Sequence, residues 1–359
     1  MENKIQDRLI HLDSLRGIAA VTVALHHSIL CINGISHQGH QLGALLGSSP
    51  VIFFFLLSGF VLSKSLLKND GLSLTSIVRY YIRRIFRLYP AVLIAIFISA
   101  LLAKYYANCT DYTIAGDWLK KSINNAQQVG GFKSYINELI LINTNLDNPL
   151  WTIKVEFVCS FIFPFLLLIV NKNKNLKTPF FCILSVALYY SSSLGNYYWE
   201  YIFIFYLGYL VFESSKFLKT IPSSATLCLL SIGFMLLLFT ILSGFMYVTA
   251  AIILAGILSV LVPCNSKYIK NLLLSRPIEY LGRISFSFYL LNVPFTLLVF
   301  SLCKKYYPSV LVNNHPIISA LMIFVSSFIL TIVAASLSFF IVEDKFNKIG
   351  HSFSKQMSL

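Results

Sequence analysis

The sequence is short of charge, and shortest of negative charge. Only 12% of its 359 residues are charged, and 28 Lys and Arg stand against 14 Asp and Glu, for a net charge of +14. A soluble protein would carry about 25% charged residues. Long apolar runs recur from one end to the other, and the mean hydropathy is +0.75. This composition excludes an ordinary soluble domain and predicts a polytopic membrane protein.

The sequence also lacks the motifs of the common nucleotide-binding, hydrolytic and metal sites. It has no Walker A loop, Rossmann glycine fingerprint, HExxH helix or GxSxG elbow. Its seven cysteines are scattered, without a CxxC pair or a Cys/His cluster, so we expect neither a zinc site nor a structural disulfide. We therefore expect no metal cofactor.

Ten apolar segments are long enough to be membrane helices. With the N-terminus on the inner side, 21 of the 28 Lys and Arg fall inside, six fall outside, and Lys154 lies within a span. This asymmetry follows the positive-inside rule, so the positive charge indicates membrane orientation and no nucleic-acid partner is expected. The fold class predicted is an all-α polytopic membrane protein with about ten transmembrane helices and both termini cytoplasmic. The segments are 13–32, 50–67, 88–106, 149–170, 178–194, 198–213, 224–243, 246–263, 284–303 and 315–341.

No soluble block is long enough to form a second domain. We expect one integral membrane domain over residues 1–345 and a short cytoplasmic tail over 346–359. The longest outer loop, about 106–148, is polar and aromatic, and we expect it to cover an external opening.

The first apolar segment carries ionisable residues, which a membrane helix usually avoids. Arg16 and His27 are eleven residues apart, which is three helical turns plus about 20°, so they share a face about 16 Å apart. Asp13 lies near the same face, whereas His26 points about 100° away and is expected to be structural. Ionisable groups at this depth usually face the protein interior or a wet cavity. Because imidazole exchanges protons near neutral pH, His27 is a candidate general base; the alternative is a core histidine bonded to a neighbouring helix.

A basic cluster follows the second segment on the predicted inner side. Arg79, Arg83 and Arg87 recur every four residues and share a helical face, with Arg84 beside them. Arginine forks bind phosphate oxygens bidentately, so the cluster is a candidate phosphate site. The alternative is that these residues only set topology and bind anionic lipid.

A carboxylate lies within the apolar run of the fourth segment. Glu156 is two residues after Lys154, and the two point in nearly opposite directions on a helix. Glu156 therefore needs a partner on another helix, and we expect His27 or Arg16. The alternative is an ion pair that serves the structure alone.

Two more segments carry small or polar residues at helical spacing. Ser58 and Gly59 allow a helix or a ligand to approach the backbone of the second segment closely. Ser285, Tyr289 and Asn292 are spaced by four and three residues in the ninth segment and share a face. They either line a cavity or join helices by hydrogen bonds.

Taken in order, five of these segments resemble the acyltransferase-3 family of integral membrane O-acyltransferases. The family's motif of an arginine, ten residues and a histidine falls on Arg16 and His27. The segments are LDSLRGIAAVTVALHH, FFFLLSGFVLS, RRIFRLYP, NPLWTIKVEF and LGRISFSFYLLNVP.

Two more family elements fall on this sequence. The RRxxR element falls on Arg83, Arg84 and Arg87, and the WxxxxE element on Trp151 and Glu156.

The sequence departs from the family at one motif. The late motif often reads YLWH, one residue and Pro, whereas this chain reads YLLNVP, with Asn292 in place of the histidine. Asn292 cannot titrate, so any proton transfer falls to His27.

The resemblance implies acyl transfer, most often of acetyl, from cytoplasmic acyl-coenzyme A to a sugar hydroxyl. The expected donor is acetyl-CoA, and the expected acceptor is a cell-surface or lipid-linked glycan such as O-antigen or another surface polysaccharide. The other expected partners are membrane lipids, and the expected location is a bacterial inner membrane.

The resemblance also implies roles for the residues above. Arg83, Arg84 and Arg87 would hold the coenzyme A phosphates, with the thioester beside Ser58 and Gly59. His27 would be the general base, Arg16 with Asp13 would tune the charge of the site, and Glu156 would orient His27 or balance Arg16. Trp151, Tyr289 and Asn292 would line the substrate cavity.

Two other functions stay open from the sequence alone. Buried Arg, His and Glu also suit a proton-coupled transporter or flippase of a sugar-lipid or anionic substrate, although no convincing internal repeat is visible. A glycan polymerase or ligase would use a lipid-linked sugar and no thioester.

Overall fold

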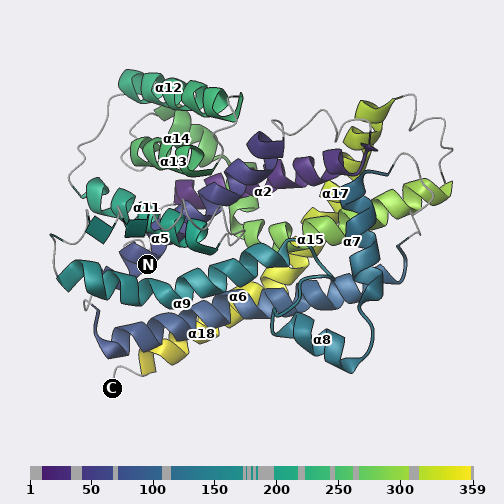
Figure 1. The fold of residues 1–359 in the computed structure, drawn as a ribbon, viewed down its shortest axis with the longest axis horizontal. Helices are drawn as coiled ribbons and strands as arrows, with labels where there is room; N and C mark the ends of the chain where they lie inside the picture. Colours follow the sequence, from purple (N-terminus) through teal and green to yellow (C-terminus); the bar gives the residue numbers. More distant parts are fainter. Residues whose placement is uncertain are drawn as a thin grey trace.

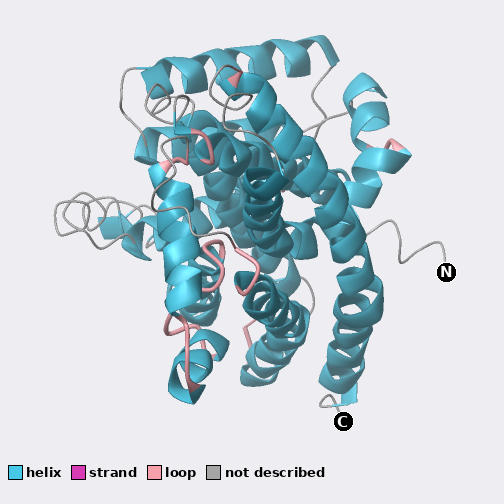
Figure 2. Cartoon of the chain, turned by 90° about the vertical axis from the view of Figure 1, so that its right-hand side faces the viewer, coloured by secondary structure: helices cyan, strands magenta, loops and turns pink. Residues whose placement is uncertain are grey.

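The structure is a computed structural model of the chain, and most of the part that it describes is helical. Within that part no strand is present, and one isolated bridge pairs Ile32 with Ala115 (Figure 2). The structure describes residues 10–33, 43–67, 72–106, 115–172, 175, 179–180, 183–184, 198–216, 223–242, 247–261, 267–306 and 315–356. Most of the expected span 178–194 lies outside these ranges.

Helices of very different length make up the molecule. Figure 1 shows α6, α9 and α18 along its lower half and α12, α13 and α14 at its upper left. The α-helices are α2 (Ile10–Leu30), α5 (Ser49–Leu67), α6 (Leu74–Ala103), α7 (Asp117–Gln128), α8 (Phe132–Leu139), α9 (Leu150–Lys172), α11 (Tyr198–Ser215), α12 (Ser223–Leu242), α13 (Tyr247–Leu261), α14 (Lys267–Leu273), α15 (Arg276–Tyr306), α17 (Pro316–Ser338) and α18 (Asp344–Gln356). Two π-helical turns accompany them, η1 (Ala44–Ser48) and η3 (Phe339–Glu343).

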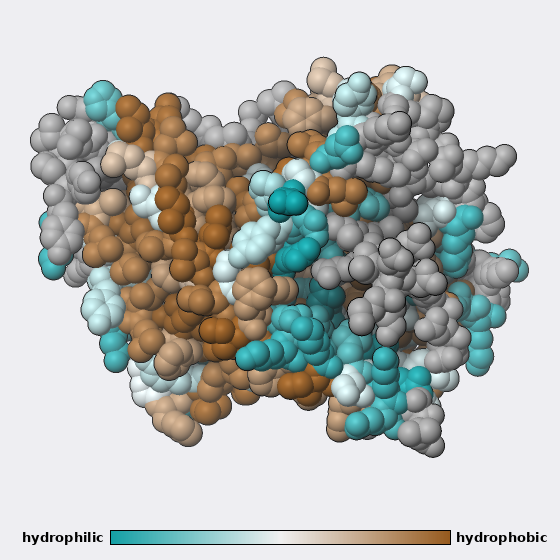
Figure 3. Space-filling view, turned by 180° about the vertical axis from the view of Figure 1, so that it is seen from behind, coloured by the Kyte–Doolittle hydropathy of each residue, from teal (hydrophilic) through white to brown (hydrophobic). Residues whose placement is uncertain are grey.

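Five helical stretches in the described part are long and apolar enough to cross a membrane. The stretch of α15 is the most enclosed of them, with 72% of its most apolar window buried, so α15 forms the centre of the bundle. Figure 3 shows apolar side chains over one broad side of the rear face and polar ones near its centre. The five stretches are Leu45–Leu67, Leu74–Ala103, Leu150–Lys172, Arg276–Lys305 and Pro316–Gln356.

Helices α2 and α15 cross at a pair of glycines. A Cβ atom on Gly17 would lie 2.6 Å from the backbone nitrogen of Gly282. A Cβ atom on Gly282 would lie 2.6 Å from the carbonyl of Asp13. This contact brings the α2 backbone at Asp13 against α15, and the rest of α2 runs along α15.

Helices α5 and α11 make a second close contact. A Cβ atom on Gly59 would lie 2.1 Å from the carbonyl oxygen of Phe205, and one on Gly208 would lie 2.3 Å from that of Leu56. Gly59 therefore serves helix packing, and it does not line either of the two cavities described below.

Part of the expected tail is helical. Helix α18 packs along α6, where the backbone of Gly350 lies against the ring of Phe86. Just before it, η3 places the carboxylate of Glu343 2.7 Å from the hydroxyl of Ser287 on α15, and that hydroxyl donates to it.

Replacing Gly59 with Ala should destabilise the bundle, because the new methyl group would overlap a carbonyl oxygen of α11. Overpacking of this kind costs about 1–3 kcal/mol. The measurement is the yield of monodisperse protein and its Tm in detergent.

The matched control is Gly256→Ala on α13, where nothing lies within 4 Å of the new methyl group. This variant should be as stable as the parent or more so, since Ala favours a helix. Equal behaviour of the two variants would contradict the close contact at Gly59.

Candidate functional site

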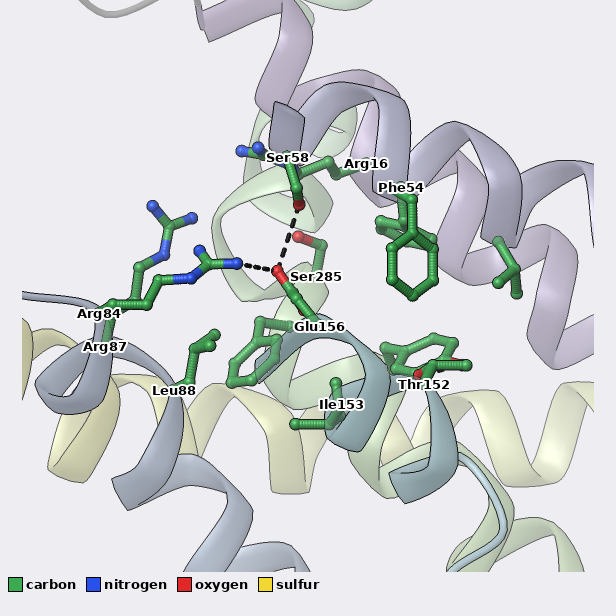
Figure 4. A pocket seen from close by; sticks show the side chains of 14 residues that line it. Arg16, Phe54, Ser58, Arg84, Arg87, Leu88, Thr152, Ile153, Glu156 and Ser285 are labelled. Atoms are coloured by element: carbon green, nitrogen blue, oxygen red, sulfur yellow. Dashed lines mark hydrogen bonds and ion pairs between the residues drawn. The ribbon is translucent and has the colours of Figure 1, made fainter. Parts of the chain in front are cut away.

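One cavity in the described part of the bundle is lined by guanidinium groups, and we call it the arginine cavity. It holds about 660 Å³ of non-protein space, part of which is open to solvent. Figure 4 shows side chains from α2, α5, α6, α9 and α15 converging on it. The polar residues that line it are Arg16, Ser58, Arg84, Arg87, Thr152, Glu156, Ser285 and Tyr289.

A buried ion pair crosses one side of this cavity. The Arg84 guanidinium donates through Nη2 to Oε1 of Glu156, and the Ser58 hydroxyl donates to the same oxygen at 3.2 Å (Figure 4). Arg84 also donates through Nε to the hydroxyl of Ser160 at 3.1 Å. The sequence-based expectation that Glu156 pairs with His27 or Arg16 is therefore wrong.

The reason lies in the packing of α6 on α9. One turn before Arg84, the hydroxyl of Tyr80 donates to the Ser160 carbonyl at 3.0 Å, and that of Tyr81 donates to the Phe161 carbonyl at 2.6 Å. These bonds align α6 with α9 and bring Arg84 against Glu156, a juxtaposition that spacing along a single helix does not encode.

Arg16 enters the cavity from α2 with a partner of its own. Its Nη1 lies 2.9 Å from Oδ1 of Asp13, one turn earlier on the same helix, and both side chains are largely buried. Asp13 does not line the cavity, so it pairs with Arg16 from outside the lining.

Of the basic cluster on α6, Arg84 and Arg87 line the cavity, whereas Arg83 does not. Within the described residues Arg87 forms no hydrogen bond or ion pair. Asp13 pairs with Arg16 and Glu156 pairs with Arg84, so Arg87 leaves the lining with a net positive charge that favours an anion.

The second cavity is lined by rings and small polar groups, and we call it the histidine cavity. It holds about 730 Å³ of non-protein space, part of which is open to solvent, and no Lys, Arg, Asp or Glu is among the described residues that line it. His26 also lines it, packed against Gly47 of η1. The other residues used below are His27, Ser48, Val51, Trp118, Asn148, Trp151, Tyr201 and Tyr289.

Asn292 orients the imidazole of His27. The amide of Asn292 donates to the carbonyl of Tyr289 at 2.5 Å, which directs its oxygen at Nδ1 of His27, 2.8 Å away. Since an amide oxygen only accepts, Nδ1 carries the proton and Nε2 is left as an acceptor. The ring also stacks on Trp118, with centroids 5.0 Å apart and planes 5° apart. This is the tautomer that a general base acting through Nε2 requires.

Trp118 comes from the outer segment that the sequence predicts to cover an opening, although no motif singled it out. It lies on α7, which is tied to the end of α2 by a hydrogen bond of 3.0 Å from the Gly116 nitrogen to the Cys31 carbonyl. Trp118 is the one aromatic residue of this amphipathic helix, and that was the available signal.

Two buried carboxyl groups support the same outer segment. Glu138 accepts backbone N–H groups of Asn145 at 3.1 Å and of Leu146 at 3.3 Å, which holds the turn before α9. Asp147 follows and is 1% exposed, and neither of its carboxyl oxygens has a hydrogen-bond partner among the described residues. Burial raises the pKa of Asp147 well above its usual range, and nearby Glu138 raises it further. No group of His, Cys, Asp and Glu in the described part is arranged to hold a metal ion.

Comparison with known proteins gives one match. The family model described as an acyltransferase domain matches residues 9–337, which include every residue of both cavities. No curated protein and no solved structure matches the chain.

The ion pair between Arg84 and Glu156 should be strongly coupled. Arg84→Gln and Glu156→Gln should each destabilise the protein by about 3–5 kcal/mol, because each leaves a buried charge without its partner. The double variant should lose less than the sum, by about 1–3 kcal/mol. A double-mutant cycle on unfolding in detergent measures this coupling.

The pair Arg283 and Glu279 on α15 serves as the control, since the Arg283 side chain is 53% exposed. Its coupling should stay below about 0.5 kcal/mol. Additive effects at Arg84 and Glu156 would mean that their contact contributes nothing to stability.

Proposed function

This chain belongs to the acyltransferase-3 family, and from that premise we propose that it moves an acyl group, acetyl above all, from cytoplasmic acyl-CoA to a glycan hydroxyl. The acceptor in this proposal is a cell-surface or lipid-linked sugar. The observation that carries the proposal is the oriented imidazole of His27 in a cavity that adjoins an arginine-lined one.

The arginine cavity suits the donor, because coenzyme A carries several phosphate charges. Arg87 has an unoccupied fork within the described part, and Arg83 lies four residues before it on α6, so we assign these two to the phosphates. The fork of Arg84 is already occupied by Glu156 and Ser160, so we assign Arg84 to positioning Glu156. The thioester would lie beside Ser58 at the cavity wall.

In the transfer step, the acceptor oxygen attacks the thioester carbonyl carbon, and its proton passes to Nε2 of His27. A C–O bond forms, the C–S bond breaks, and the thiolate takes a proton to leave as free coenzyme A. General base help of this kind contributes about 10²–10⁴ in rate. Arg16 lines the cavity that would hold the thioester, where it would tune the charge of the site.

The histidine cavity suits a neutral sugar. Trp118, Trp151 and Tyr201 offer flat apolar faces that can pack against a sugar ring. Asn148 and Ser48 offer hydrogen bonds to its hydroxyl groups. A cavity without Lys, Arg, Asp or Glu among its described lining gives an anionic acceptor no counter-charge.

The topology proposed is about ten transmembrane helices with both termini cytoplasmic, in a bacterial inner membrane. The distribution of basic residues along the sequence supports it. The integral domain would cover 1–345 and the cytoplasmic tail 346–359, with membrane lipids around the bundle.

Replacing His27 with Ala should abolish acyl transfer while the protein still inserts and folds. Free coenzyme A released from acetyl-CoA in the presence of an envelope glycan fraction is the measurement, together with mass spectrometry of that glycan. A proton-coupled transporter or flippase would release no coenzyme A. His315→Ala, at the exposed start of α17, is the control and should leave the rate unchanged.

Variants of Asn292 test whether the orientation of the His27 imidazole matters in addition to its presence. Asn292→Leu should lower kcat with little change in KM for acetyl-CoA, whereas Asn292→His restores a partner for Nδ1 and should retain activity. Normal transfer by the His27→Ala variant would remove the imidazole from the mechanism.

Arg87→Ala should raise the KM for acetyl-CoA about tenfold or more with a smaller effect on kcat, since a charge-assisted hydrogen bond contributes about 1.5–3 kcal/mol. Steady-state kinetics at varied acetyl-CoA provide the measurement. Arg276→Ala, an exposed arginine at the start of α15, is the matched control. If both variants behave alike, Arg87 serves membrane topology and not the donor.

A further inference from the structure

One tyrosine belongs to both cavities. Tyr289 and Val51 line the arginine cavity and also the histidine cavity, whereas the other described lining residues belong to one cavity alone. The Tyr289 side chain is large and only 7% of the residue is exposed, so its ring fills the space between the two. Toward the arginine cavity it meets the ring of Phe54, with centroids 5.6 Å apart.

Among the described residues, Thr152 is the hydrogen-bond partner of the Tyr289 hydroxyl, and the direction of this bond follows from the neighbours of Thr152. Thr152 donates its one hydroxyl proton to the Pro149 carbonyl at 2.8 Å. The Tyr289 hydroxyl, 3.0 Å from Thr152 Oγ1, must therefore be the donor to it. By contrast, Tyr80 and Tyr81 donate to fixed backbone carbonyls of α9. The partner of Tyr289 is instead a side-chain hydroxyl, that of Thr152.

The same residue is linked to the imidazole through its backbone. Its carbonyl accepts the Asn292 amide, and Asn292 in turn holds Nδ1 of His27. One turn of α15 therefore holds both the Tyr289 ring and the imidazole of His27.

We propose that Tyr289 is the partition between the arginine cavity and the histidine cavity, and that it selects short acyl groups for transfer. In this proposal an acyl group that moves from the arginine cavity toward His27 passes the Tyr289 ring, so a longer chain meets more resistance there. The assignment of an acyl group rests on the proposed function, whereas the partition itself does not.

The partition can be tested independently of acyl transfer, by the rate at which a thiol in the arginine cavity is modified. Ser285→Cys places the thiol where Ser285 lines that cavity, and a charged, membrane-impermeant thiol reagent is added to sealed vesicles of each orientation. Mass spectrometry of the peptide that carries position 285 avoids interference from the native cysteines. We expect modification at least ten times faster from one membrane face than from the other, and nearly equal rates after Tyr289→Ala.

Tyr280→Ala is the matched control, because Tyr280 lies on the same helix and its hydroxyl donates to Ser336 at 2.6 Å, outside both cavities. It should preserve the difference between the two faces. Equal rates from both faces in the Ser285→Cys parent, or a difference that survives Tyr289→Ala, would overturn the partition.

Selectivity is tested with acetyl-, butyryl- and octanoyl-CoA as donors. Tyr289→Ala should raise the ratio of kcat/KM for butyryl-CoA to that for acetyl-CoA at least tenfold and should increase hydrolysis without acceptor, whereas Tyr280→Ala changes neither. An unchanged ratio would overturn the role in selection. If the parent releases coenzyme A from none of these donors, the proposed function and the role in selection both fail, while the thiol experiment still decides the partition.

Discussion

The contact between Arg84 and Glu156 is the interaction on which the architecture of the site depends. Two charges inside a membrane bundle are costly unless each has a partner and further hydrogen bonds, which Ser58 and Ser160 supply. The four side chains join α5, α6 and α9 around one side of the arginine cavity. Because Glu156 is used in this way, Arg87 keeps its charge for a ligand.

The two cavities differ in the kind of molecule that they can accept. One has guanidinium groups and a net positive charge, and the other is aromatic and uncharged along its described lining. Both are built against α15, the most enclosed of the five stretches that could cross a membrane. A donor with phosphate groups can therefore approach α15 from the arginine cavity, and a neutral acceptor can approach it from the histidine cavity.

Spacing along single helices predicted a large part of this arrangement. It placed Arg16 and His27 on one face of α2, and it grouped Ser285, Tyr289 and Asn292 on one face of α15 while leaving open whether they line a cavity or join helices. In the structure Arg16 and Ser285 line the arginine cavity, His27 lines the histidine cavity, and Tyr289 lines both. It paired Glu156 wrongly, because the partner depends on how α6 crosses α9. Trp118 was also missed, since it reaches His27 from an outer segment whose path no periodicity determines.

The asparagine that replaces the family's late histidine has a consequence for how the site handles protons. An amide oxygen can accept a hydrogen bond from the imidazole but cannot keep a proton, so no relay leads from Nδ1 further into α15. A proton that arrives at Nε2 has to depart from Nε2. Nε2 would then act first as a base and afterwards as an acid. The imidazole would lose its proton on the same side from which it took that proton up.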